Sequence, residues 1–244
     1  MPLRLAVLAV FVAAIALQGP ATRQTESDTE QFAVGERLRY SVSFGRLHVG
    51  SGEMSVLGID TVDGRPTWHA MLTISGGVPL FRVHDTTMSW FDTGTFVSRR
   101  FAQYVNEGLY HVRRDFKIDP EQRTYVKNRE PVTASSPDPL DDVSFLYFAR
   151  TLPLADGDRY EFHRYFQPEG NPVVLRVIRR ERVTVPAGTF RAILVEPEIV
   201  TSGIFSQGGH AQLWFSDDSS RVLLQMKAHL SFGSINLYLN RGDR

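Results

Sequence analysis

"VHDTTMSWFDTGTFVSRRFAQYVNEGLYHVRRDFKI", residues 83–118, contains three stretches in which polar and apolar side chains alternate. Alternation with a period of two is typical of β-strands that bury one face. Turn residues separate the stretches at Asp92-Thr93-Gly94 and at Asn106-Glu107-Gly108. Connections this short join antiparallel neighbours, because parallel strands need a crossover of about a dozen residues or more. The segment therefore predicts an antiparallel meander.

The same rhythm continues on both sides of this segment. Before it, "RLRYSVSF" (37–44) and "TWHAMLTIS" (67–75) alternate, and after a proline-rich stretch (130–140) strands resume near residue 159. In all, the pattern predicts about a dozen strands. A sheet of that size curls or splits into two layers. We predict an all-β fold: a large curved antiparallel sheet or open barrel.

One stretch, "DDVSFLYFARTLPL" (141–154), breaks the rhythm because its apolar residues fall on every side of a helix. Asp138 or Asp141 suits the N-cap, and Pro153 cannot continue a helix. We predict one short helix over 140–150. A helix that is apolar on all sides is normally buried, so we expect the sheet to wrap around it. The helix is then a core plug, and also one wall of a ligand cavity if the interior is not filled.

Residues 1–21 are typical of a cleavable signal peptide. The apolar run over 5–17 is too short to span a bilayer comfortably, and small residues permit cleavage after Ala16 or Ala21. The alternative is an uncleaved anchor. We expect a disordered polar leader over 22–31, a single β domain over 32–244, and a periplasmic or secreted protein.

Composition excludes several classes of protein. The 244-residue chain contains no cysteine, which excludes a disulfide framework and the lipid-modified cysteine of a bacterial lipoprotein. No segment after the signal is long and apolar enough to cross a bilayer. The 27 basic residues equal the 27 acidic ones, and the expected compartment holds no nucleic acid, so a nucleic-acid partner is not expected.

The sequence contains no recognisable catalytic or metal-binding motif. None of the seven histidines forms a His-x-His, His-x-x-x-His or His-Glu-x-x-His pair, and no Gly-x-Ser-x-Gly elbow occurs. The carboxylate pairs Asp141-Asp142 and Asp217-Asp218 fall at a helix start and in a turn, where capping explains them. We therefore predict no catalytic residue, no metal and no cofactor, although a site assembled from distant strands stays open.

Two groups of residues are candidates for binding. If the helix leaves a cavity, the aromatic residues that would line it are Phe145, Tyr147 and Phe148 on the helix and Trp68, Trp90 and Trp214 on the sheet. Simple core packing explains the same residues. In "LRVIRRERV", a regular strand puts Arg176, Arg180 and Arg182 on one face, where they are candidates for contact with an anionic group or form an ordinary solvated face.

Four stretches, taken in order, resemble a bacterial exported family, the domain of unknown function numbered 3108. They are "VGERLRYSVSFGRLHVGSGEM", "DVSFLYFARTLPLADGDRY", "ERVTVPAGTFRA" and "AQLWFSDDSSRVLLQMKAHLSFGSINLYL". The resemblance covers nearly all of 32–241 and implies an exported antiparallel β protein with no established enzymatic activity. By fold analogy alone, the architecture is also similar to the half-barrels that carry lipoproteins across the periplasm.

Three functional hypotheses follow. The first is a non-catalytic periplasmic protein that binds a hydrophobic or amphipathic ligand, such as a lipid, between sheet and helix. The second is an envelope scaffold with a closed core, which meets a partner protein through a strand edge or a basic face. The third, an unrecognised enzyme, has the least support, since no acid, base and nucleophile converge in the sequence.

Overall fold

The computed structural model describes residues 31–78, 81–198, 211–230 and 233–242. The predicted signal peptide and nearly all of the predicted leader lie outside these ranges and stay predictions. The elements are β1 (Arg37–Phe44), β2 (Leu47–Val62), β3 (Arg65–Val78), β4 (Phe81–Asp92), β5 (Ser98–Glu107), β6 (Tyr110–Asp119), β7 (Thr124–Lys127), β8 (Thr133–Ala134), α1 (Asp142–Arg150), β9 (Arg159–Phe162), a 3-10 turn (Pro168–Gly170), β10 (Val173–Val185), β11 (Gly188–Glu198), β12 (Ala211–Ser216), β13 (Leu223–Leu230) and β14 (Gly233–Leu239).

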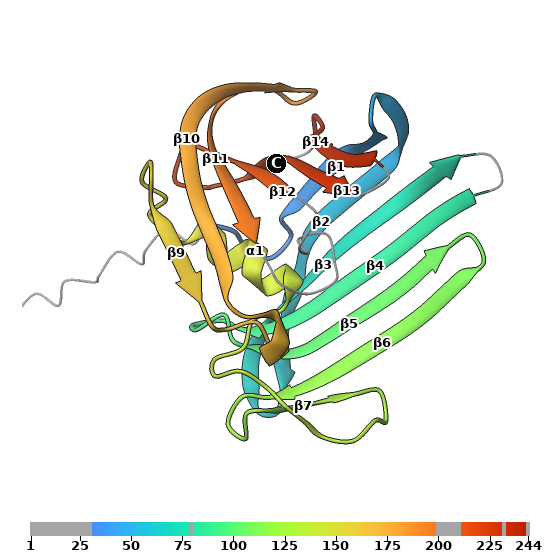
Figure 1. Ribbon diagram of the computed structural model, residues 1–244, viewed down its shortest axis with the longest axis vertical. Helices are drawn as coiled ribbons and strands as arrows, with labels where there is room; N and C mark the ends of the chain where they lie inside the picture. The colour runs from blue at the N-terminus through green and yellow to red at the C-terminus, as the bar shows by residue number, and fades with distance from the viewer. Residues whose placement is uncertain (1–30, 79–80, 199–210, 231–232, 243–244) are drawn as a thin grey trace, which may run out of the picture.

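The strands form a single antiparallel sheet that curves around α1 (Figure 1). Its fourteen strands follow the order β8-β7-β6-β5-β4-β3-β2-β1-β14-β13-β12-β11-β10-β9. Pairing of β1 with β14 joins the two halves of the chain, with Val42 opposite Leu237. The sheet is not closed, since β8 and β9 are its edges. The predicted all-β class with a curved, open sheet is confirmed, with two more strands than the approximate count.

Loop segments join the two edges. The chain after β8 and the chain after β9 meet through a parallel bridge between Leu140 and Tyr165. The Phe166 amide donates to the Leu140 carbonyl at 2.9 Å, and the Ser135 hydroxyl donates to the Phe166 carbonyl at 2.8 Å. These bonds tie the segment that follows one edge strand to the segment that follows the other, outside β8 and β9 themselves.

Turn chemistry sets the hairpins. Asp63 and Gly64 between β2 and β3 both have positive φ, 48° and 75°, as a type I′ turn requires. Between β5 and β6 the two turn residues are Gly108 and Leu109, and only Gly108 has positive φ. This is the Gly-X pattern of a type II′ turn. The predicted turn at 106–108 was therefore wrong for two of its three residues, because Asn106 and Glu107 remain paired in β5.

Helix α1 fills the concave side of the sheet and packs against β3 and β4. The predicted start at residue 140 was wrong, because Asp141 is the N-cap: its side chain accepts from the Val143 and Ser144 amides at 2.8 and 2.9 Å. The Tyr147 ring lies 4.6 Å from Phe32 and 5.6 Å from Phe91, measured between ring centroids. The helix is therefore part of the core, as its apolar sequence predicted.

Candidate functional site

A cavity of about 840 Å³ lies at the end of the sheet where the chain leaves α1. Four connections and the start of β3 meet there: the segment before β1, the β4–β5 loop, the turn after α1 and the β12–β13 turn. The residues lining it are Gln31, Phe32, Trp68, Thr93, Gly94, Phe96, Thr151, Leu152, Pro153, Asp217, Asp218, Ser219 and Arg221. One side of the cavity is thus aromatic and aliphatic, and the other side is charged.

The apolar side is built on Phe32. Its ring makes an edge contact with Trp68 at 5.2 Å and another with Phe96 at 6.1 Å. Phe96 has a positive φ of 62°, an uncommon conformation for a bulky residue, which turns the β4–β5 loop towards the cavity. Leu152 and Pro153 complete this side after the helix ends. The result is an aromatic floor that favours apolar groups.

Arg150, in the last turn of α1, connects the segments that form the walls of the cavity. Its side chain is fully buried, and its Nη1 and Nη2 donate to the two carboxylate oxygens of Glu36 at 2.7 and 2.9 Å. Nη2 also donates to the carbonyls of Gln31 at 2.6 Å and Ser220 at 2.9 Å. One guanidinium therefore connects the helix, the segment before β1 and the β12–β13 turn. The bidentate geometry makes these strong, directional bonds.

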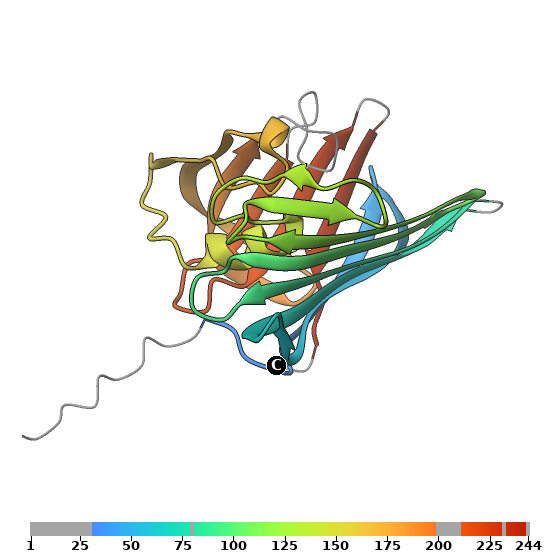
Figure 2. The same cartoon turned by 90° about the horizontal axis from the view of Figure 1, so that it is seen from below.

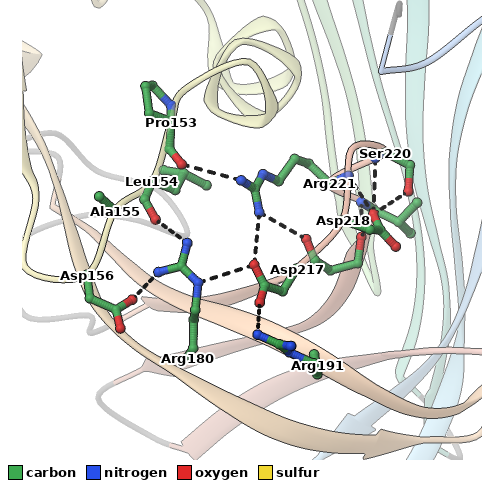
Figure 3. A network of polar contacts seen from close by, with 12 residues as sticks. Pro153, Leu154, Ala155, Asp156, Arg180, Arg191, Asp217, Asp218, Ser220 and Arg221 are labelled. Atoms are coloured by element: carbon green, nitrogen blue, oxygen red, sulfur yellow. Dashed lines mark hydrogen bonds and ion pairs between the residues drawn. The ribbon is translucent and has the colours of Figure 1, made fainter.

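The charged side is a network around Asp217 (Figure 3). Arg180, Arg191 and Arg221 approach its carboxylate at 3.2, 3.0 and 3.5 Å. Arg221 also donates to the Pro153 carbonyl at 3.3 Å and so ties the β12–β13 turn to the turn after α1. Asp156 also pairs with Arg180, and Asp218 lies next to Asp217, so three carboxylates balance the three arginines. Arg221 is the arginine of this network that lines the cavity.

Asp218 shapes the turn next to this network. Burial by itself would raise the pKa of its carboxyl. The Ser220 and Ser216 hydroxyls donate to this carboxyl at 2.6 and 2.8 Å, and the backbone amides of Ser220 and Arg221 donate to it as well. These hydrogen bonds outweigh burial and hold the pKa of Asp218 below its usual value. Asp218 is therefore ionised at neutral pH and already accepts several bonds, which suits a turn-forming residue more than a proton donor.

Of the six aromatic residues predicted to line a cavity, Trp68 lines this one. Tyr147 packs behind Phe32 in the core. Phe148 lies against Phe96 and Phe162, at 6.0 and 5.3 Å between ring centroids, and Phe145 also contacts Phe162, at 6.4 Å. The three helix aromatics therefore pack the interior beside the cavity wall.

The placement of Trp90 and Trp214 on the helix side was wrong. Phe91 contacts Tyr147 of the helix, and successive side chains of a strand point to opposite faces, so Trp90 faces outward. There its Nε1 donates to Asp60 at 2.8 Å, and its ring stacks on His69 at 4.3 Å. Alternation alone cannot say which face of a strand is the concave one, which explains the error.

Trp214 likewise belongs to the outward face. Its Nε1 donates to Glu181 at 2.6 Å, and the Lys227 ammonium lies 5.1 Å from the ring centroid. The hydrogen bond from Trp214 is the main reason that the pKa of Glu181 is lowered. This tryptophan covers a charged outer surface with its ring and keeps its N–H paired.

The three predicted arginines do not share one face. A β-bulge between Val177 and Arg179 shifts the register of β10, so that Arg176 lies opposite Glu196 while Arg180 lies opposite Ile193. Partners three residues apart on β11 point to opposite faces. Arg176 pairs with Glu198, Arg180 joins the Asp217 network with Asp156, and Arg182 is exposed opposite Arg191. A single extra residue thus separated a set that the regular pattern put together.

Sequence reasoning missed the residues that organise the site, above all Arg150 with Glu36, and Arg221. One signal was present: an arginine inside a helix that is apolar on all sides must find a buried acceptor. The sequence did not identify that acceptor, because Glu36 lies 114 positions away.

The described residues do not include a group of three or more His, Asp or Glu side chains able to hold a metal ion. A Ser–His contact does occur on the outer face of β3–β4, where the Ser75 hydroxyl lies 2.7 Å from His84 Nδ1. His84 is exposed and Ser75 is half-buried, and no carboxylate of the described residues pairs with His84. This pair lacks the third group and the buried setting that activate a serine.

The fold and this cavity define a barrel-like β protein: an open, curved antiparallel sheet around one helix, with a half-apolar cavity at one end. The family model for "Protein of unknown function (DUF3108)" matches residues 39–240, and the chain belongs to that family. The family predicted from the sequence motifs is therefore confirmed.

A solved structure shares the architecture. A β-barrel-like protein of the domain of unknown function DUF1849 from Brucella abortus superposes with a TM-score of 0.52 at 10% sequence identity, covering 83% of this chain and 94% of that one. A putative exported protein with a YmcC-like fold from Bacteroides fragilis NCTC 9343 gives a TM-score of 0.38 at 11% identity, covering 87% and 97%. No curated protein matches the sequence. In the described part of the chain, no helix is long and apolar enough to cross a membrane.

Proposed function

We propose that this protein is an exported, non-catalytic β protein that binds an amphipathic molecule in the cavity between Phe32, Trp68 and Arg221. The division of the cavity into an aromatic floor and a charged rim is the observation that carries this proposal. Amphipathic ligands need both kinds of surface at one site, whereas a packed core needs only the first.

The size of the cavity supports a single-chain ligand. Its volume of about 840 Å³ falls within the range of about 300–1,000 Å³ that is usual for small-molecule sites. An acyl chain would lie on Phe32, Trp68 and Phe96, away from water. Its head group, a carboxylate or phosphate, would meet the guanidinium of Arg221, whose planar fork matches such oxygens.

A single-tryptophan protein tests the proposal directly. Changing Trp90→Phe and Trp214→Phe leaves Trp68 as the only tryptophan of the chain, and both replaced residues lie on the outer face. We expect a brominated fatty acid to quench Trp68 fluorescence saturably. The reverse variant, Trp68→Phe with Trp90 and Trp214 retained, should show no saturable quenching.

Native mass spectrometry of residues 22–244, purified from a bacterial periplasm, provides an independent readout. A bound lipid mass that disappears on organic extraction supports the proposal and identifies the ligand class. An apo mass together with unquenched Trp68 in a folded protein would overturn it and favour the scaffold hypothesis.

A further inference from the structure

The end of the sheet opposite the cavity collects two of the hairpin turns. Strand β1 ends at Phe44 and β2 begins at Leu47, while β5 ends at Glu107 and β6 begins at Tyr110. The antiparallel register from β1 through β6 puts both turns at the same end. Figures 1 and 2 show these long strands running past the helix to that end of the molecule.

Exposed apolar side chains stand at both turns. Leu109 is 99% exposed, Leu47 59%, Tyr110 51% and Phe44 39%. We call these four residues the apolar rim. Single exposed apolar residues are ordinary on a protein surface, but grouped ones at one end mark a surface that meets an apolar partner.

The turns themselves do not require these residues. Gly45 and Gly108 have φ values of 57° and 58° and occupy the position of a type II′ turn that demands glycine. The second turn positions, Arg46 and Leu109, accept nearly any residue, and polar ones are usual there. A fully exposed leucine at such a tip contributes nothing to folding that a polar residue would not.

Turns at the cavity end have the opposite character. Each of four carries an aspartate: Asp63 in β2–β3, Asp92 at β4–β5, Asp119 at β6–β7 and Asp217 at β12–β13. The two ends therefore differ in the residues at their turns: aspartates at one end, of which Asp92 and Asp217 are paired with arginines, and the apolar rim at the other.

Cations accompany the apolar rim. Arg46 lies in one turn, Arg113 follows the other, and Arg82 lies at the start of β4 between them, all three exposed. Among the described residues, no ion pair of Arg46 or Arg82 is found within 4 Å. The nearby acids are Asp85 and Glu107, which share a hydrogen bond; burial, followed by the charge of Asp85, raises the pKa of Glu107. Positive charge thus prevails beside the rim.

We propose that this end docks on the surface of an anionic lipid bilayer through the apolar rim. Leu47 and Leu109 enter the boundary between head groups and acyl chains, and the aromatic rings of Phe44 and Tyr110 lie at the interface. Arg46, Arg82 and Arg113 meet the phosphates, which attract basic residues near the surface. The turns at the cavity end point away from the membrane. This docking does not depend on the ligand cavity, which lies at the other end.

Vesicle flotation tests the docking. The protein is residues 22–244, which retain every described residue and lack the apolar run over 5–17 that would itself bind lipid. Vesicles contain phosphatidylglycerol and phosphatidylcholine, and a second set contains phosphatidylcholine alone. We expect the protein to float with the anionic set. The double variant Leu47→Ser with Leu109→Ser should bind these vesicles at least about tenfold more weakly.

The matched control changes two exposed apolar residues away from this end, Ile59→Ser and Val132→Ser, which are 54% and 66% exposed. This control should float like the parent protein. Equal loss in the control, absence of flotation by the parent, or equal binding to neutral vesicles would each overturn the proposal. Quenching of Trp68 by brominated fatty acid, measured on the same rim variant, separates failure of docking from failure of ligand binding.

Discussion

Both carboxylate oxygens of Glu36 accept hydrogen bonds from the guanidinium of Arg150, at 2.7 and 2.9 Å, inside the protein. The two residues are 114 positions apart, and the Arg150 side chain has no exposed surface. This ion pair attaches the helix to the segment that begins the sheet. It also positions Phe32 over the cavity, since Arg150 donates to the carbonyl of the preceding residue, Gln31.

Removing one partner of this pair should be strongly destabilising. We expect Arg150→Met to lower the free energy of unfolding by about 3–5 kcal/mol, because Glu36 is then left without its partner in a partly buried place. Urea denaturation measures the loss. The exposed pair Arg39–Glu53 is the control: Arg39→Met should cost less than about 1 kcal/mol. Equal losses in the two variants would contradict the structural role of Arg150.

Two buried tyrosines should respond oppositely to loss of the hydroxyl. Tyr40 donates to the Leu223 carbonyl at 2.9 Å, whereas the Tyr147 hydroxyl is buried without a hydrogen-bond partner among the described residues. We expect Tyr40→Phe to cost about 1–2 kcal/mol of stability and Tyr147→Phe to be neutral or stabilising by up to about 1 kcal/mol. Thermal denaturation of both variants decides this; a loss on Tyr147→Phe as large as that of Tyr40→Phe would refute it.

Stability should depend on pH through Asp142. Burial, reinforced by the charge of neighbouring Asp141, raises the pKa of Asp142 from 3.8 to about 6, while the Tyr165 hydroxyl donates to it at 3.2 Å. The folded state therefore holds the proton more tightly than the unfolded state. This contribution to stability is complete below about pH 4 and is lost as pH rises through about 6.

Asp142→Asn isolates this contribution, because the amide cannot ionise and its oxygen still accepts from Tyr165. As pH rises from about 4 to 6.5, the parent should lose up to about 3 kcal/mol of unfolding free energy relative to the variant. Above this range the difference between the two proteins should stay constant. Urea titrations at closely spaced pH values measure it. A difference that does not change over this interval would show that Asp142 titrates normally.

Loss of the Arg221 side chain should weaken binding only of ligands that carry an anionic head group. If the proposed cavity binds an acyl chain, Arg221→Gln should weaken binding of a fatty acid by about tenfold, the usual cost of a lost charge-assisted bond. Binding of the corresponding fatty alcohol should hardly change. Isothermal titration of both ligands measures this, with Arg191→Gln, outside the cavity lining, as the matched control. Equal weakening for acid and alcohol would indicate that the turn itself had moved.

Local patterns were sufficient for much of the fold. Alternation predicted the strands, glycine and aspartate predicted the turns, and the all-round apolar run predicted the helix, since each depends on residues only a few positions apart. Even the curvature followed from strand number, because a sheet this wide does not stay flat. Where local prediction was wrong, the cause was also local: the bulge after Val177 moved Arg180 and Arg182 to the face opposite Arg176.

The site itself depends on contacts that no local pattern contains. Phe32, Trp68, Arg150 and Arg221 come from four separate segments, and they meet only because β1 pairs with β14 and the sheet curves around the helix. Strand alternation specifies two faces but not which one becomes the interior, so Trp90 and Trp214 were indistinguishable from Trp68 until the sheet had curved. Amino-acid order thus determined the family, the strands and the buried helix of this protein, whereas the cavity, its ion pairs and the apolar rim arose from long-range packing.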